Sequence, residues 1–583
     1  MGSEQSILEN KGYVLEKTEN KNDPDMPFAA TKGDEKFLIK MFTSNPASEI
    51  TIQGELDSER KLLNISHPHI VSSKIEISGY YYVVTDYCEG GSLADKIKER
   101  NEPPQESEVL SWIVEICMAL KTIHQKGFLQ KDLTPEDIHF TTFGKLCLGG
   151  YQKVYENLKN TTSKKSSTET GYMAPEVYLK GTFDVKSDIW SVGCILYELC
   201  TLQPAFSAES TIMLTSKIHQ GPYPTLPEHF SEDLCDLLND IFNQDPVSRP
   251  TTSEIMECPL IINCLINKIK KTLNEVQTKV DALRALADGL ERVHQGTTIG
   301  SLAGGVIGAA GGITSIVGLF LAPFTLGASL IVTGVGVGVG AVGSVTAGVS
   351  NITNMVNQST DRKAVRNVIK EIEEKTHAVI TWLQELNNSL QKARSRCETL
   401  ECGHSKKEYL AKSGIRGLKC LGGVAELVRL VKVMNVGKIA AQGSRVVLVA
   451  QVTTGVLSAL FVAADIFFIA MDAKEIHHIR QAKAANEGTN SEAESEAATN
   501  VDMSTSDEVE LLPGVPKHNR SQSQDQSPSE NTQVNSEVMK FVLCVRKAAD
   551  DLQKVLDELK SMIESITSPE DDSNLDCHNR NAV

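Results

Sequence analysis

The sequence has few aromatic residues, no excess of positive charge and no regular pattern of cysteines. Aromatic residues make up only 5% of the 583 residues, so the apolar share of 41% is mostly aliphatic. The formal net charge of −17 argues against a nucleic-acid-binding protein held by a broad basic surface. The 13 cysteines are scattered, which is typical of a reducing intracellular compartment rather than of a disulfide-stapled domain.

An apolar signal sequence is also missing from the first residues, MGSEQSILEN. Residues 1–10 therefore have the composition of a flexible N-terminus. Gly2 and Ser6 nevertheless fit the M-G-x-x-x-S pattern of N-myristoylation, so Gly2 is a candidate lipidation site. A plain flexible terminus is the alternative, and one acyl chain by itself anchors a protein only weakly.

Composition divides the chain into several parts, as its length leads us to expect. The Ser-, Glu- and Gln-rich part cannot bury a core and is predicted to be a disordered linker. The last apolar stretch has the three- and four-residue spacing of an amphipathic helix. We expect a mixed domain at 11–260, a helical domain at 262–484, the acidic linker at 485–535, the amphipathic helix at 536–567 and a disordered tail at 568–583.

A long tract without Asp, Glu, Lys or Arg, residues 293–360, lies inside the helical domain. Two apolar arms within 299–349 are each about the 20 residues that a helix needs to cross a bilayer, and small residues at four-residue steps favour helix contacts in lipid. The residues that we expect to form this membrane hairpin are Gly304, Gly308, Gly312, Pro323, Gly336 and Gly340. A buried hairpin in a soluble protein is the alternative. Basic residues on both flanks predict that the flanks face the cytosol.

A second apolar segment, residues 446–471, is interrupted by Asp465. An ionised carboxylate is costly inside a bilayer, so one hypothesis is that the segment inserts when Asp465 is protonated. The other interpretation is an amphipathic helix whose aspartates face water.

Five motifs in the first half of the chain occur in a recognisable order. They are HPHIV at 67–71, YCEGGSLADKI at 87–97, GYMAPEV at 171–177, SDIWSVGCILYEL at 187–199 and DPVSRP at 245–250. Together they resemble the NIMA-related (Nek) protein kinases. The resemblance implies an α+β bilobal protein-kinase fold. It also implies a buried ion pair between Glu176 and Arg249, and hydrogen bonds from the catalytic-loop backbone to Asp188.

The same resemblance assigns candidate catalytic residues. The motif FLIK places the β3 lysine at Lys40, and QKDLTPED places the catalytic base at Asp132. Glu59 would pair with Lys40, and Thr85 would join them in a nucleotide-binding site. Asp137 replaces the asparagine of the family and could still ligate Mg²⁺.

Two elements that handle phosphate are missing. The metal-binding DFG triplet of the family aligns with Leu148-Gly149-Gly150, and leucine offers no oxygen ligand. The segment that aligns with the glycine-rich loop, residues 16–29, contains no glycine and carries acidic side chains. One interpretation is a Ser/Thr kinase that uses ATP and Mg²⁺, with no other metal expected. The two losses favour the other, a pseudokinase.

The second half of the chain resembles apolipoprotein L. The resemblance rests on LRALADGLERVHQGTTIGSLAGG at 283–305, IVGLFLAPFTLGASL at 316–330 and DIFFIAMDAKEIHH at 465–478. It implies an all-α helical domain with a hydrophobic hairpin that binds membrane lipids.

Three functions follow from the two resemblances. They are a kinase-fold signalling domain coupled to a lipid-binding domain, an active kinase targeted to membranes, and a lipid-transport or pore-forming effector regulated by its kinase-like domain. We expect membrane lipids and a protein partner of the kinase-like domain, but no nucleic acid. The expected location is the cytosolic side of a membrane, with an extracellular protein as the alternative by analogy to apolipoprotein L.

Overall fold

The computed structural model describes residues 8–16, 28–33, 35–42, 65–77, 81–131, 133–149, 171–301, 347–401, 442–496 and 530–567. The chain forms two compact units. The first unit comprises residues 1–273, 374–448 and 559–583, and the second comprises residues 274–373 and 449–558.

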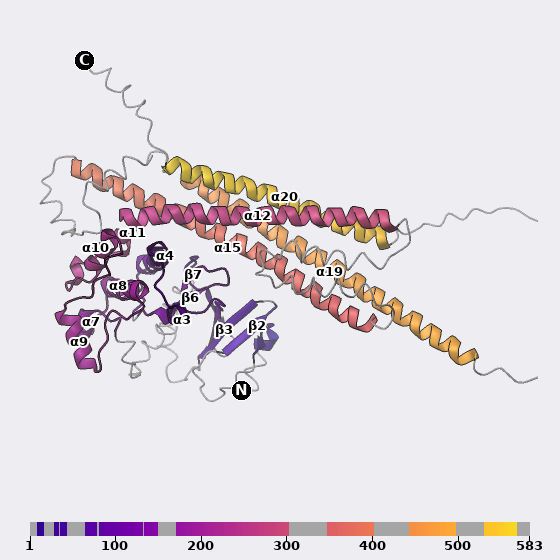
Figure 1. Ribbon diagram of the computed structural model, residues 1–583, viewed down its shortest axis with the longest axis horizontal. Helices are drawn as coiled ribbons and strands as arrows, with labels where there is room; N and C mark the ends of the chain where they lie inside the picture. The colour runs from indigo at the N-terminus through magenta and orange to yellow at the C-terminus, as the bar shows by residue number, and fades with distance from the viewer. Residues whose placement is uncertain are drawn as a thin grey trace, which may run out of the picture. The chain divides into compact units, whose positions relative to one another are not determined.

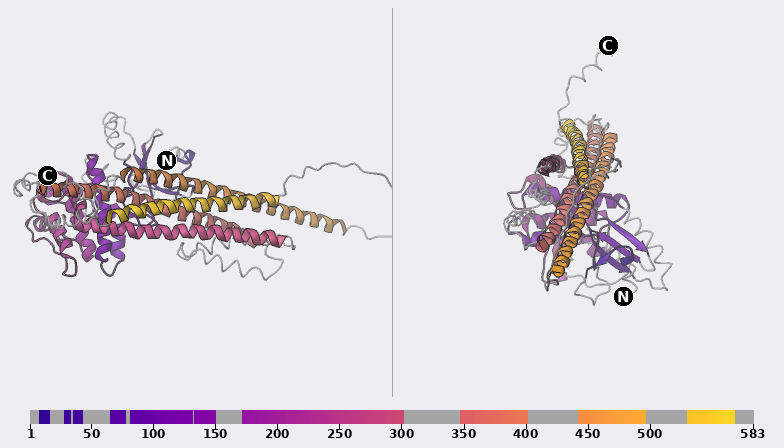
Figure 2. Two further views of the ribbon diagram at one scale, coloured as in Figure 1. Left: turned by 90° about the horizontal axis from the view of Figure 1, so that it is seen from above. Right: turned by 90° about the vertical axis from the view of Figure 1, so that its right-hand side faces the viewer.

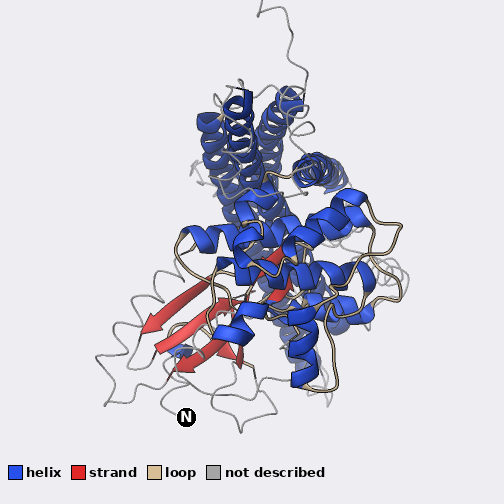
Figure 3. Ribbon diagram, turned by 90° about the vertical axis from the view of Figure 1, so that its left-hand side faces the viewer, coloured by secondary structure: helices blue, strands red, loops and turns tan. Residues whose placement is uncertain are grey.

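A five-stranded antiparallel sheet lies on one side of the first unit, with helices beyond it (Figure 3). In the order β1-β2-β3-β5-β4, its strands are β1 (Val14–Leu15), β2 (Phe28–Lys32), β3 (Glu35–Phe42), β5 (Tyr81–Asp86) and β4 (Ser73–Ile77). One face of the sheet is closed by a core of Leu8, Tyr13, Ala30, Phe37, Ile39, Tyr82 and Val84. Leu8 and Tyr13 come from the residues before the sheet, so this part of the N-terminal segment belongs to the folded core.

The helical part of the first unit follows the sheet in the chain. Its elements are α3 (Leu93–Glu99), α4 (Glu106–Gln125), η2 (Pro135–Asp137), β6 (Ile138–Phe140), β7 (Leu146–Leu148), α7 (Pro175–Lys180), α8 (Val185–Thr201), α9 (Thr211–Gln220), α10 (Glu232–Ile241), η3 (Pro246–Ser248) and α11 (Thr252–Met256). A small sheet followed by a helical lobe confirms the predicted α+β fold class.

Helix α8 is the buried centre of this lobe. It begins at a capping box between Asp184 and Ser187, and the Asp184 side chain also accepts a hydrogen bond from the Lys186 N–H. Trp190 is fully buried and its ring contacts the rings of Phe206 and Phe242 at centroid distances of 5.5 and 5.0 Å. Gly193 lets α10 approach closely, because a Cβ there would lie 2.4 Å from Ile241 Cγ2.

Four long helices continue the chain: α12 (Pro259–Ser301), α15 (Ala347–Glu401), α19 (Gly443–Glu496) and α20 (Glu530–Thr567). Within the second unit, their segments run alongside one another (Figures 1 and 2). The helix α19 extends past residue 485, and α20 begins before residue 536, so both helices reach into the predicted linker. The all-α class predicted for this half of the chain is confirmed.

Polar contacts fix the antiparallel pairing of α12 and α20. The Gln277 amide donates to Gln553 at 2.7 Å, Arg284 pairs with Asp550 at 3.3 Å, and Arg546 pairs with Asp288 at 2.6 Å. The residue numbers rise along α12 as they fall along α20, which only an antiparallel pair allows.

Asp465 lies neither in an apolar environment nor free in water. Its carboxylate accepts hydrogen bonds from Arg366 at 2.7 and 2.8 Å and from Arg362 at 3.3 Å. The sequence left two alternatives for this residue, and the structure adds a third, an ion pair between α19 and α15.

Among the described residues, one segment is long and apolar enough to cross a membrane. It is Arg445–Met471 of α19, with a mean hydropathy of 2.2 over its most apolar window and 28% of that window buried. The predicted hairpin at 299–349, with Gly304, Gly308, Gly312, Pro323, Gly336 and Gly340, lies outside the described residues apart from its two ends, as do Gly2 and the tail at 568–583.

The substitution Gly193→Ala tests the close contact of α8 with α10. We expect it to lower the free energy of unfolding by about 1–3 kcal/mol, because the added methyl group overlaps Ile241. Thermal unfolding of the full chain measures this effect. Gly455→Ala is the matched control, since Gly455 also lies in a helix but faces open space. An equal loss in both variants would contradict the steric explanation.

Candidate functional site

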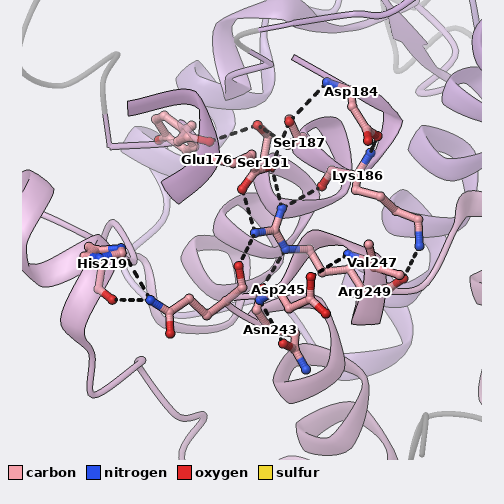
Figure 4. Close-up of polar contacts among 12 residues, drawn as sticks. Glu176, Asp184, Lys186, Ser187, Ser191, His219, Asn243, Asp245, Val247 and Arg249 are labelled. Atoms are coloured by element: carbon pink, nitrogen blue, oxygen red, sulfur yellow. Dashed lines mark hydrogen bonds and ion pairs between the residues drawn. The ribbon is translucent and has the colours of Figure 1, made fainter. Parts of the chain in front are cut away.

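A buried ion pair fastens the segment around Glu176 to the helical lobe. The Arg249 Nη1 and Nη2 atoms each donate to one Glu176 carboxylate oxygen at 2.8 Å (Figure 4). The Arg249 side chain is fully buried, its Nε donates to the Asn243 carbonyl oxygen at 2.7 Å, and its guanidinium lies 5.0 Å from the Trp190 ring centroid. Ser187 adds a hydrogen bond to Glu176 at 2.8 Å. This bidentate contact joins the two residues that the kinase resemblance pairs.

Asp188 organises the backbone that precedes the predicted catalytic base. Its carboxylate accepts hydrogen bonds from the N–H groups of Gln130 and Lys131 at 3.0 and 2.9 Å, and His124 Nε2 lies 2.7 Å away. Lys131 has a φ of 51°, a left-handed conformation that non-glycine residues adopt rarely. The two hydrogen bonds to Asp188 hold this strained turn in place.

Asp137, the candidate magnesium ligand, is engaged by its own loop. Its Oδ2 atom accepts hydrogen bonds from the backbone N–H and the hydroxyl of Thr134, both at 2.9 Å, and its side chain is buried. Thr134 stands where the family has a phosphate-contacting lysine. The loop therefore places a neutral hydroxyl, rather than a cation, beside this carboxylate.

Leu148 is an interior residue. It ends β7 and only 1% of it is exposed. Its backbone is paired on both sides, since its N–H donates to the His69 carbonyl at 2.8 Å and its carbonyl accepts from the Val71 N–H at 3.0 Å. The following residue, Gly149, leaves no room for a side chain, because a Cβ would lie 2.8 Å from His139 Cδ2.

The two metal-ligand positions that the resemblance implies are both altered. Kinases hold the metal with an aspartate and an asparagine. Here a buried leucine, Leu148, stands at the first position, and at the second Asp137 offers a carboxylate whose Oδ2 accepts hydrogen bonds from Thr134. No group of three or more His, Cys, Asp or Glu within the described ranges could hold a metal ion.

The structure describes the remaining predicted residues only in part. Lys40 lies in β3, paired with Val83, but its side chain lies outside the described residues. Thr85 in β5 accepts a hydrogen bond from the Ser73 hydroxyl at 3.1 Å. Glu59, Asp132 and Gly150 lie outside the described residues, as does most of the loop at 16–29.

Sequence reasoning missed His69 and Trp382. The two rings are joined by a hydrogen bond of 2.7 Å although they lie 313 residues apart. A single tryptophan on an amphipathic helix gives no signal of its partner, so only the folded chain reveals this contact.

We predict that the ion pair of Glu176 makes the stability of the folded chain sensitive to acid. Burial by itself raises the pKa of this carboxyl, but the hydrogen bonds and charge of Arg249 outweigh it, so the pKa lies below its ordinary value of 4.5. A carboxyl with a lowered pKa contributes stability above its unfolded pKa and loses it as the pH falls through its folded pKa. Glu176→Gln should cost about 3–5 kcal/mol at neutral pH, because Arg249 loses its buried partner.

Urea unfolding between neutral pH and about pH 2, a range that includes the protonation of this carboxyl in the unfolded chain and extends well below it, measures both effects. The wild-type chain should lose stability with falling pH more steeply than Glu176→Gln, which has no carboxylate to protonate. The control is Glu89→Gln, because Glu89 pairs with Lys36 on the surface and exposed pairs contribute little. Parallel pH profiles for wild type and Glu176→Gln would count against the role of the ion pair.

Comparison with known families finds a match for each half of the chain. Residues 28–261 match the protein kinase domain, and residues 263–494 match apolipoprotein L. The boundary between the two matches falls within the first turns of α12.

Curated relatives are similar to the first half. The chain is 38% identical over 223 residues to the serine/threonine-protein kinase Nek1 of Mus musculus, which covers 36% of this chain and 18% of that protein. It is 34% identical over 238 residues to Nek3 of the same organism, covering 38% and 46%. It is 30% identical over 274 residues to mouse Nek4, covering 45% and 34%. The chain thus spans less than half of the length of these relatives.

Proposed function

Because this chain joins a Nek-like protein kinase domain to an apolipoprotein L domain, we propose that it is a signalling scaffold directed to membranes. The kinase domain binds a protein partner without transferring phosphate, and the apolipoprotein L domain binds lipid. The proposed location is the cytosolic side of a membrane.

Leu148 is the observation that carries the first half of this proposal. The residue at the metal-binding position is a leucine packed in the interior, and its backbone is held by His69 and Val71. No rearrangement of a leucine side chain supplies an oxygen ligand. By contrast, the residues that hold the fold together, Glu176, Asp188 and Arg249, keep their contacts. This combination supports a folded domain that works by binding.

An exposed apolar face on α19 supports the second half. Small and apolar residues follow one another at three- and four-residue steps, which places them on one stripe of the helix. The stripe consists of Val452, Gly455, Ala459, Val462, Ile466 and Ile469, of which Val462, Ile466 and Ile469 are each more than half exposed. An uncharged stripe of this length is a surface that lipid can cover.

Nucleotide addition tests the kinase half. We expect Mg²⁺ and ATP to leave the thermal unfolding temperature of the full chain unchanged, because the metal ligand set is incomplete. We also expect no phosphate transfer from radiolabelled ATP to a generic basic substrate. Transfer that is abolished by Asp132→Asn would instead establish the alternative function, an active Ser/Thr kinase targeted to membranes. Asp137, which could ligate one metal ion, is the residue that favours this alternative.

Sedimentation with anionic phospholipid vesicles tests the lipid half. The double substitution Val462→Gln, Ile466→Gln should weaken binding by tenfold or more, since each large apolar side chain contributes roughly 1.5–3 kcal/mol when it leaves water. The matched control is Ile212→Gln, Met213→Gln, which changes two exposed apolar residues of the kinase domain. Equal vesicle binding by both double variants and the wild type would exclude this face as the lipid contact.

Dye release from the same vesicles distinguishes the third function. A pore-forming effector restrained by its kinase domain should leak more dye when the kinase domain is destabilised by Glu176→Gln. A scaffold that only binds lipid should leak equally little in both forms.

A further inference from the structure

A buried polar cluster joins the kinase domain to a helix of the apolipoprotein L domain within the first compact unit. The cluster, called here the His69 cluster, consists of His69, Glu115, Lys268 and Trp382. His69 precedes β4, Glu115 lies in α4, Lys268 lies in α12 and Trp382 lies in α15. The residues thus come from four separate parts of the chain.

His69 has a partner on each ring nitrogen. Its Nδ1 lies 2.8 Å from the Leu146 carbonyl oxygen, which can only accept, so Nδ1 carries the proton. Its Nε2 is therefore the acceptor for the Trp382 Nε1–H at 2.7 Å, and the two ring planes differ by 2°. His69 is fully buried, and burial lowers its pKa to about 3. Without Trp382, this neutral ring would keep a buried acceptor with no donor.

Lys268 and Glu115 complete the cluster. The Lys268 ammonium lies 2.6 Å from Glu115 Oε1 and 4.8 Å from the centroid of the Trp382 ring. The other Glu115 oxygen accepts a hydrogen bond from the Leu146 N–H at 2.9 Å. Both the N–H and the C=O of Leu146 are therefore held by members of the cluster. The Lys268 ammonium also lies over the Trp382 ring, and such a cation–π contact is most favourable away from water.

Charged contacts extend the docking along α15. Glu374, Glu385 and Arg396 follow at eleven-residue intervals, which is three helical turns, so they share a face. Their contacts are complementary in charge: Glu374 meets Lys145 at 3.5 Å, Glu385 pairs with Lys121, and Arg396 meets Glu257 at 3.0 Å. Together with Trp382, these residues make four points of contact between Glu374 and Arg396, which indicates a specific docking surface.

Backbone hydrogen bonds connect the docked helix to Leu148 and Asp137, the two predicted metal-ligand positions. His69 accepts from the Leu148 N–H at 2.8 Å, and Gly149 donates to the Asp137 carbonyl at 2.7 Å. One short chain of contacts thus runs from Trp382 through His69 and Leu148 to Asp137. If α15 moved, these hydrogen bonds would either break or shift together with the helix.

We propose that the segment of α15 from Glu374 to Arg396 is an intramolecular partner of the kinase domain. It docks on α4, α12 and the loop at 65–71, and it fixes the positions of Leu148 and Asp137. The folded kinase domain therefore includes a helix from the apolipoprotein L domain. Any event that withdraws this helix is transmitted through His69 to Leu148 and Asp137.

Hydrogen–deuterium exchange of the full chain tests the proposal. Trp382→Phe keeps a ring at this position but removes the donor to His69. We expect the amides of residues 69–71 and 146–149 to exchange about tenfold faster, because a buried acceptor is left unpaired. Gln384→Ala, on the exposed face of the same helix, should change nothing.

A charge exchange provides a second variant with its own rescue. Glu385→Lys places two cations together at Lys121 and should accelerate exchange at residues 69–71 and 146–149 as well. Adding Lys121→Glu should restore protection, since the opposite charges then face each other again. This pair keeps the test valid even if Trp382→Phe folds poorly.

Faster exchange within 378–390 alone, with residues 69–71 and 146–149 still protected, would overturn the proposal. It would mean that α15 detaches without affecting the segment that contains Leu148. Unchanged exchange everywhere in both single variants would overturn it equally, because the docking would then contribute nothing.

Discussion

The ion pair between Arg249 and Glu176 is the interaction on which the kinase lobe depends. A fully buried cation is tolerated only with a partner that matches its charge and geometry, and Glu176 supplies both. Ser187, at the first turn of α8, shares Glu176, and Trp190 of the same helix stacks beneath the guanidinium. The ion pair thereby sets the position of α8, and Asp188 of α8 then holds the backbone of Gln130 and Lys131.

The residues that support the fold differ from those that the kinase resemblance assigns to metal binding, and the contacts of the first set are formed. Glu176, Asp188 and Arg249 act through buried hydrogen bonds that need no ligand. Leu148, in contrast, stands where the resemblance implies a metal ligand, and its side chain packs in the interior. A domain can therefore lose its chemistry without losing stability, because the two depend on separate contacts. This separation is the reason why we propose binding as the function of the kinase domain.

The helical half carries two kinds of surface with different physical roles. Ion pairs such as Arg366 with Asp465 and Arg546 with Asp288 join neighbouring helices, whereas the stripe around Val462 and Ile466 on α19 is left apolar and exposed. The segment of α15 that bears Trp382 has a third role, because Trp382 is buried in contact with His69 of the kinase domain. The apolar stripe and the segment around Trp382 therefore lie on different helices, α19 and α15.

The sequence by itself determined both fold classes, because motif order, charge-free tracts and helical periodicity depend only on local residues. It also predicted the partnership of Glu176 with Arg249, since a family pattern links these positions. Tertiary structure alone decided the partners of Asp465 and Trp382. Their contacts bring together residues that are 99 and 313 positions apart, and no local pattern specifies such a pairing. It also decided the state of Leu148: the sequence shows that an oxygen ligand is lost, but only the packed chain shows that the leucine is buried in its place.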